Sequence, residues 1–125
     1  METQIFVLGD ADHVREKIER ALLACDLEEV SRFSNQLKIS VQTLVRAMED
    51  RLQAFTVMCG GDDVLFLVDR KFYIRAIVSD LATVFCQDSG CTMSFGVGDT
   101  IERAYVNLRR AKAGGGGLID KGVGK

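Results

Sequence analysis

The sequence predicts an α+β fold in which an antiparallel or mixed sheet carries helices mainly on one face. Short apolar, β-branched runs alternate with longer stretches whose apolar residues recur at helical spacing. No proline interrupts any of them. The 125 residues are 47% hydrophobic and 27% charged, as in a soluble globular domain. We therefore expect a single domain over residues 1–120 and a short tail over residues 121–125.

A hairpin that carries two adjacent carboxylates at its tip is the feature on which the rest depends. The runs Phe55 to Met58 and Val64 to Val68 are β-branched and aromatic, which predicts two central strands. Between them, Gly60 and Gly61 are expected to supply the positive φ angles of a tight turn. Two glycines also leave room for a bulky ligand to lie on the turn.

The paired acids at the end of this turn suggest a metal site. Asp62 and Asp63 would repel each other between buried strands, and a divalent cation removes that cost. The alternative is an ordinary turn, because glycine and aspartate are common in hairpins for local reasons.

The chain begins with a strand that leads into a helix. Gln4 to Gly9 is a compact apolar run, which predicts a strand. In the residues that follow, the apolar positions recur at helical spacing, which predicts a helix: Val14, Ile18, Ala21, Leu22 and Cys25. The junction places Asp10 at the carboxyl end of a strand, where sheets of this class build their sites. Alternatively, Asp10 or Asp12 caps the helix.

The next helices and strands follow from caps and periodicity. Asp26 with Glu29 resembles a capping box, and it opens a long helix over about Leu27 to Arg51. Its apolar face is Val30, Phe33, Leu37, Val41, Leu44, Met48 and Leu52. After the hairpin, Asp69 is expected to cap a third helix that ends at Gly90, with an inner face of Tyr73, Ile77, Leu81 and Val84.

The last third of the chain adds two strands around a fourth helix. Cys91 to Val97 reads as a strand, and Asp99 with Glu102 is a candidate cap for the helix. Its expected inner face is Ile101, Ala104, Tyr105, Leu108 and Ala111. The glycines 114–117 stop it, or form a phosphate cradle, before a short edge strand over residues 118–120. The order β-α-α-β-β-α-β-α-β is that of a palm-like, ferredoxin-related sheet.

Composition and charge exclude several classes of function. A net charge of −2 gives no electrostatic footprint for duplex nucleic acid. The sequence shows no signal peptide and no apolar run long enough to cross a membrane, so a cytoplasmic location is expected. The cysteines at positions 25, 59, 86 and 91 form no Cys-x-x-Cys pair and are expected to be reduced, mostly in the core.

Three separated motifs together resemble the GGDEF and CRISPR-polymerase palm superfamily over essentially the whole chain. They are Asp10-Ala11-Asp12-His13-Val14-Arg15, the Gly60-Gly61-Asp62-Asp63 turn, and Ser94-Phe95-Gly96-Val97 followed by Ala104, Leu108, Ala111, Lys112 and Gly115. The GGDD turn on a bare palm is most similar to the minimal CRISPR polymerases. This resemblance implies polymerisation or cyclisation of nucleotides with two divalent metals.

Departures from the diguanylate cyclase pattern indicate which nucleobase the chain would recognise. Ile18 stands where diguanylate cyclases use Asn to read guanine, and Leu27 stands where a second guanine-reading carboxylate would be expected. The Arg-x-x-Asp product-inhibition motif is absent, and Gly116 replaces the arginine that usually follows the lysine. The resemblance therefore favours adenine over guanine.

The resemblance and the residues agree on a site. Asp10, Asp62 and Asp63 are expected to hold two Mg²⁺ or Mn²⁺ ions. The backbone amides of Asp12, His13 and Val14 would bind the triphosphate, with the His13 side chain at the surface or beside the site. Lys112 would meet a β- or γ-phosphate, unless it is only a favourable charge at a helix end.

The leading hypothesis is an enzyme that condenses ATP into a cyclic dinucleotide or a short cyclic oligoadenylate. A homodimer with the active site at its two-fold interface would supply both half-sites. The resemblance further implies antiphage defence and a separate effector protein that reads the product. The alternatives are a nucleotide-binding palm without turnover, acting as a sensor or scaffold, and a mononucleotide cyclase acting on ATP.

Overall fold

The computed structural model describes residues 3–122 and has the predicted order of elements. The strands are β1 (Gln4–Ala11), β2 (Phe55–Cys59), β3 (Asp63–Asp69), β4 (Met93–Gly98) and β5 (Ile119–Asp120). The helices are α1 (Val14–Leu23), α2 (Leu27–Leu52), α3 (Arg75–Ser89) and α4 (Ile101–Ala113). The predicted α+β class is confirmed. The predicted tail begins at Lys121, and its residues 123–125 lie outside the described part of the chain.

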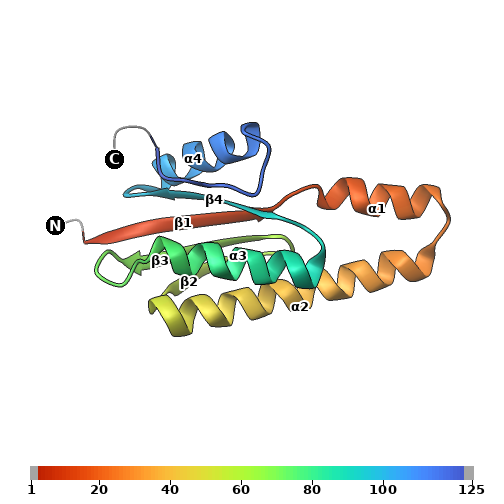
Figure 1. The fold of residues 1–125 in the computed structure, drawn as a ribbon, viewed down its shortest axis with the longest axis horizontal. Helices are drawn as coiled ribbons and strands as arrows, with labels where there is room; N and C mark the ends of the chain where they lie inside the picture. The colour runs from red at the N-terminus through yellow and green to blue at the C-terminus, as the bar shows by residue number, and fades with distance from the viewer. Residues whose placement is uncertain (1–2, 123–125) are drawn as a thin grey trace.

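The sheet is mixed, with strand order β2-β3-β1-β4-β5 (Figure 1). All neighbours are antiparallel except β4 and β5. The prediction that both strands of the hairpin are central is correct for β3 and wrong for β2, which is an edge strand with Phe55 67% exposed. A register shift between Thr56 and Met58 interrupts the edge, as is common where an edge strand must not recruit another chain.

The main core lies between the sheet and the pair α2 and α3. Alternate residues of the central strands point into it, and the long apolar stripe of α2 meets them as predicted. Its most fully buried large side chains include Phe66, Phe85, Phe95 and Met48. The strands β1 and β3 present Phe6, Leu8, Leu65 and Leu67 to the opposite face.

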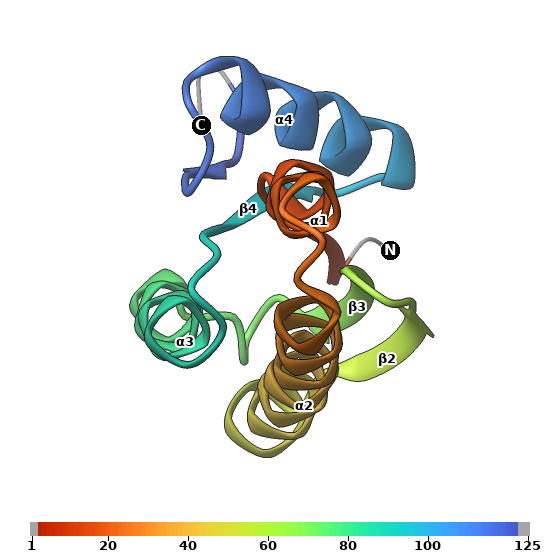
Figure 2. The same ribbon diagram turned by 90° about the vertical axis from the view of Figure 1, so that its right-hand side faces the viewer.

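Helix α4 covers that opposite face over β4 and β1 (Figure 2). Gly96 and Gly98 allow this close approach: a Cβ on Gly96 would clash with the Ala104 carbonyl, and one on Gly98 would lie 2.6 Å from the Ala104 nitrogen. The helices are thus divided between the two faces, with α2 and α3 on one and α4 on the other, where the sequence predicted helices mainly on one face. Within residues 3–122, the main strand contacts of α4 are with β4, β1 and β5.

Two predicted caps are confirmed and two are wrong. Asp26 accepts a hydrogen bond from the Glu29 amide at 3.0 Å, and Gly90 ends α3 with a φ of 80°. Asp69 instead accepts from the Lys71 amide in the turn after β3, and α3 begins later, at Arg75. The cap of α4 is Thr100, one residue after the predicted Asp99.

The predicted inner faces of the shorter helices are shifted. In α3 the buried residues are Val78, Leu81, Phe85 and Ser89, while Val84 is exposed. In α4, Ile101 and Tyr105 are exposed and Asn107 is buried, where its amide donates to the Val97 carbonyl at 2.8 Å. In α1 only Ala21 is fully buried, because α1 and the start of α2 extend beyond the end of the sheet (Figure 1).

The cysteine prediction is correct only in part. All four thiols are free, but only Cys91 is buried; Cys25 and Cys59 are exposed, and Cys86 is partly exposed. Within residues 3–122, none of the helices has the length and apolar character needed to cross a membrane.

Candidate metal and nucleotide site

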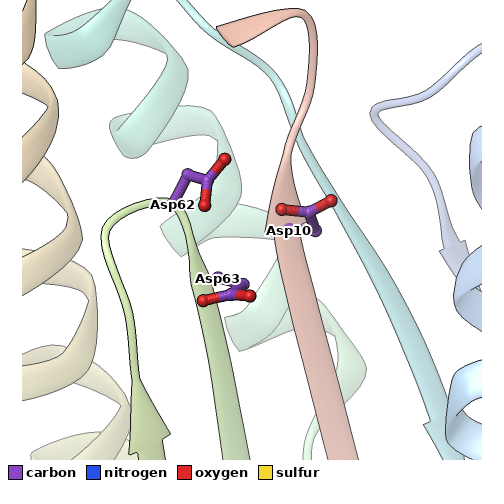
Figure 3. Close-up of side chains that lie close together, drawn as sticks. All are labelled: Asp10, Asp62 and Asp63. Carbon is purple, nitrogen blue, oxygen red and sulfur yellow. The ribbon is translucent and has the colours of Figure 1, made fainter. Parts of the chain in front are cut away.

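Three carboxylates meet at one end of the sheet: two come from the adjacent strands β1 and β3, and the third comes from the turn that joins β2 to β3 (Figure 3). Asp10 of β1 is the register partner of Asp63, the first residue of β3. The Ala11 amide donates to the Asp62 carbonyl at 2.8 Å, which fixes the turn against β1. One oxygen from each carboxylate lies within 4.8 Å of the others. The predicted convergence of Asp10, Asp62 and Asp63 is thus present in the fold.

Electrostatics at this cluster favours a cation. Burial raises the pKa of Asp10 above its ordinary value; the neighbouring charges of Asp62 and Asp63 raise it further, against the lowering effect of Lys112. Carboxylate oxygens are the ligands that Mg²⁺ and Mn²⁺ prefer, and three of them at this spacing fit such ions. The residues present therefore suit a divalent metal.

The two glycines of the turn act differently from the prediction. Neither Gly60 nor Gly61 is among the residues with positive φ. Gly60 donates its amide to the Asp63 carbonyl at 2.8 Å, and a Cβ on Gly60 would clash with the Asp63 carboxylate. Gly61 has open space where its Cβ would be. Gly60 thus admits the carboxylate, and Gly61 leaves the tip open to a ligand.

Asp12 lies next to this cluster but is already saturated with hydrogen-bond donors. Its side chain is 3% exposed and accepts from Thr92 at 2.6 Å, Ser94 at 2.9 Å and the Gly117 amide at 2.9 Å. Burial would raise its pKa, but these bonds together with that from Lys112 hold the pKa below the ordinary value. Asp12 does not cap α1, and its amide donates to the Thr92 carbonyl rather than standing free for a phosphate.

Lys112, near the end of α4, joins Asp12 to the carboxylate cluster. Its ammonium lies 2.7 Å from Asp12 Oδ1 and 3.1 Å from Asp10 Oδ2, and it also donates to the Asp10 and Ala11 carbonyls. Burial alone would lower the pKa of Lys112, but the two carboxylates outweigh it and raise that pKa. With 25% of its side chain exposed, Lys112 is more than a solvated charge at a helix end.

The predicted phosphate-binding amides lie at the start of α1. His13 is the residue before the helix, in the left-handed region with φ 61°, and its Nδ1 lies 2.8 Å from the Glu16 carboxylate. Its ring is therefore turned along α1, as expected for a surface residue. Val14 lines a cavity that opens beside the carboxylates.

This cavity, of about 510 Å³, lies between α1, α2 and the tip of the hairpin. Asp62, Gly60 and Gly61 form one wall. Across from them α2 contributes apolar Leu37 and Val41 and three polar side chains that the sequence analysis did not single out: Ser34, Lys38 and Gln42. Their spacing of four residues along one helix was a usable signal. Neither Ile18 nor Leu27 is among the lining residues.

A profile of the minimal CRISPR polymerase (mCpol) domain matches residues 6–121. The chain belongs to this family. With the palm fold, membership indicates an activity of the nucleotide-cyclase type. No curated protein gives a significant match.

Solved structures with the same fold include Csm1-Csm4 cassettes and domains of diguanylate cyclases. A Csm1-Csm4 cassette in complex with cA4 matches with a TM-score of 0.71 and 16% identity, and the chain spans 21% of that larger chain. The cassette in complex with pppApA matches with a TM-score of 0.72, also at 16% identity, and the match covers 93% of this chain and 20% of that chain. The GGEEF domain of a diguanylate cyclase from Vibrio cholerae matches with a TM-score of 0.60 and 12% identity, and the match covers 94% of this chain and 81% of that chain. At such identities the likeness shows the fold.

Proposed function

We propose that this chain condenses ATP into a cyclic dinucleotide or a short cyclic oligoadenylate. The observation that carries the proposal is the convergence of Asp10, Asp62 and Asp63 within 4.8 Å beside a cavity large enough for a nucleotide. The Csm1-Csm4 cassette, which shares this fold, was solved in complex with cA4 and with pppApA, and both of these ligands contain adenine. By family, we extend the proposal to antiphage defence with a separate effector that reads the product.

Two Mg²⁺ or Mn²⁺ ions bound by the three carboxylates would activate the attacking ribose hydroxyl and neutralise the departing pyrophosphate. The chain's own part is to hold the reactants in line. Asp10 is fixed by the strand pairing of β1, and Asp63 by the turn hydrogen bond from Gly60. Rigid ligands of this kind need no reorganisation when the substrate binds.

Lys112 and the start of α1 would bind the phosphates. The Lys112 ammonium has three N–H donors, and a turn away from Asp10 toward a β- or γ-phosphate would leave its shorter bond to Asp12 in place. The amides of His13 and Val14 at the N-terminus of α1 favour an anion.

The cavity along α2 would hold the nucleobase. Leu37 and Val41 offer an apolar surface for a ring, while Ser34, Lys38 and Gln42 offer hydrogen bonds at its edge. The guanine-reading positions of diguanylate cyclases are occupied here by Ile18 and Leu27, which cannot make those bonds. The cavity lining suits any nucleobase, and the replacement of the guanine-reading residues supports adenine.

A homodimer completes the proposal, because one palm presents one set of carboxylates and cyclisation needs two attacks. The sheet face that carries Asp10 and Asp63 continues over Leu65 and Leu67 to the exposed Phe55 and Met58 of β2. A second copy packed against this apolar area would bring two sites toward each other across a two-fold axis.

The test is to incubate the purified chain with each NTP and Mg²⁺ or Mn²⁺ and to identify the products by mass spectrometry. We expect a cyclic adenine product of two or more units from ATP, lost in Asp62→Ala/Asp63→Ala, and retained in Asp80→Asn as a matched surface control. Cyclic AMP would instead show a mononucleotide cyclase. Intact ATP with both metals, together with measurable ATP binding, would favour a sensor or scaffold.

A further inference from the structure

A second cleft lies at the far end of the sheet from the carboxylates. It occupies about 250 Å³ between the start of β1, the end of β4, β5 and the N-terminal parts of α3 and α4. Ile5 lines the cleft and Asp10 belongs to the carboxylate cluster, so about five residues of the extended strand β1, roughly 17 Å, separate the two. It is therefore a separate place in the fold.

The walls of this cleft are strongly basic. Four cationic side chains line it against one acidic side chain, Asp99, although the whole chain carries a net charge of −2. The cationic residues come from four different segments: Arg70, Arg75, Arg103 and Lys121. All four are exposed, and together they attract an anion.

Only part of this positive charge is matched within the protein. Arg103 pairs with Asp99 at 2.8 Å, and Arg75 donates to the Ile119 carbonyl at 3.2 Å. Within residues 3–122, none of the ion pairs involves Arg70 or Lys121. At least two cations at this cleft can therefore receive an external anion.

The remaining surface of the cleft is apolar and aromatic. Ile5, Val97 and Ile119 come from three neighbouring strands, and Tyr73 adds a ring that packs partly against the core. Arginine guanidinium groups bind phosphate through paired N–H donors and also stack on flat rings. A phosphate attached to a nucleoside matches both properties, whereas a bare inorganic anion would leave the apolar surface unused.

We propose that this cleft is a second nucleotide site, which binds a nucleoside monophosphate unit through Arg70, Lys121 and the neighbouring guanidinium groups. Its volume lies just below the usual range of ligand pockets, about 300–1,000 Å³, and so suits one base and its phosphate better than a whole dinucleotide. The site needs no metal, because its own side chains supply the positive charge. The proposal is independent of turnover at the carboxylates.

The experiment is a calorimetric titration of the full chain with AMP in buffer containing EDTA, so that the carboxylate cluster holds no metal. We expect saturable binding that weakens at least tenfold in Arg70→Gln/Lys121→Gln. Neither side chain has an ion pair in residues 3–122, so this double variant should keep its thermal unfolding midpoint. Two controls, Asp62→Ala/Asp63→Ala and the exposed Arg109→Gln, should bind AMP like the unchanged chain.

Three results would overturn the second site. One is the absence of AMP binding in EDTA. Another is AMP binding that the Arg70→Gln/Lys121→Gln change leaves intact but Asp62→Ala/Asp63→Ala or Ser34→Ala abolishes, which would place the ligand in the cavity along α2. The third is inorganic phosphate binding as tightly as AMP, because the apolar surface would then contribute nothing.

Discussion

Asp10 and Asp12 are two residues apart at the same end of β1, yet their surroundings are opposite. Asp10 faces two other carboxylates, and its pKa is raised by burial and by their charges. Asp12 is buried among donors from Thr92, Ser94, Lys112 and Gly117, which more than offset its burial and lower its pKa. The two carboxylates share Lys112, but only Asp12 also has neutral donors for its oxygens, whereas Asp10 faces two further negative charges.

This difference separates a binding group from a structural one. Asp10 keeps oxygens available for a cation and belongs to the only group of three or more candidate metal-ligating side chains within residues 3–122. Asp12 ties β4, the end of α4 and the glycine loop to the end of β1. By fixing Lys112, it also sets the position of the charge beside Asp10. The predictions below test this division of roles.

The largest effect should come from Asp10→Asn on turnover. Loss of one metal ligand removes several kcal/mol of transition-state stabilisation, and about 4 kcal/mol corresponds to about a thousandfold in rate. The measurement is the initial rate of product formation from ATP with Mg²⁺. Asp80→Asn, an exposed change on α3, is the matched control. Equal rates for Asp10→Asn and the unchanged chain would remove Asp10 from the site.

Asp12→Asn should instead lower stability. The change leaves a buried amide facing three donors and takes from Lys112 its shortest partner, which costs about 3 kcal/mol. Asp10→Asn should cost little, because burial and the repulsion from Asp62 and Asp63 together outweigh the favourable pairing of the Asp10 charge with Lys112. Urea unfolding in EDTA measures both. Similar losses for the two variants would contradict the division of roles.

The contribution of Asp12 to stability should depend on pH in a defined direction. Its folded pKa lies below the ordinary value of 3.8, so the stabilisation is complete above that pH and is lost as pH falls through the folded pKa. The stability difference between the unchanged chain and Asp12→Asn should be constant near neutral pH and shrink below pH 3.8. A difference that shrinks on raising the pH would reverse the sign and refute the assignment.

A smaller effect separates the two glycines of the turn. Gly60→Ala places a Cβ against the Asp63 carboxylate, which must move, and we expect Mn²⁺ affinity to fall about tenfold. Gly61→Ala meets nothing within 4 Å and should bind Mn²⁺ as before. Titration calorimetry compares the two. A weaker site in Gly61→Ala alone would show that the turn differs from this geometry.

The smallest effect should be at an exposed ion pair. Asp99, just before α4, pairs with Arg103 in the first turn of that helix, but both side chains are exposed to solvent, where such pairs contribute little. Asp99→Asn should leave urea unfolding unchanged, in contrast to Asp12→Asn. A marked loss of stability in Asp99→Asn would mean that burial does not distinguish the two pairs.

The sequence predicted the order of elements from local signals, and it predicted the three carboxylates from local signals together with the family resemblance. Apolar periodicity, the Asp26 cap and the Gly90 stop act within a few residues, and the GGDD turn is continuous in the chain. The edge position of β2 was not predictable in this way, because strand order is decided by pairing partners elsewhere in the chain. Phe55 begins an apolar run, which predicts a core residue, but its side chain is exposed.

The parts of the site that the sequence missed are held together by distant residues. The partners of Asp12 lie between 80 and 105 residues away, so a cap was the natural local interpretation. The basic cleft likewise gathers Arg70, Arg103 and Lys121 from separate segments that show no charge cluster in sequence. Gly60 looked like a positive-φ residue, while its real constraint is the nearby Asp63 side chain.

The most direct test of the central claim is Mn²⁺ binding followed by electron paramagnetic resonance, with and without a non-hydrolysable ATP analogue. We predict saturable binding, two ions per chain with the analogue, that is lost in Asp10→Asn, Asp62→Asn and Asp63→Asn and kept in folded Asp12→Asn. If the first three variants bound Mn²⁺ like the unchanged chain, or only Asp12→Asn lost it, the carboxylate cluster would not be the metal site.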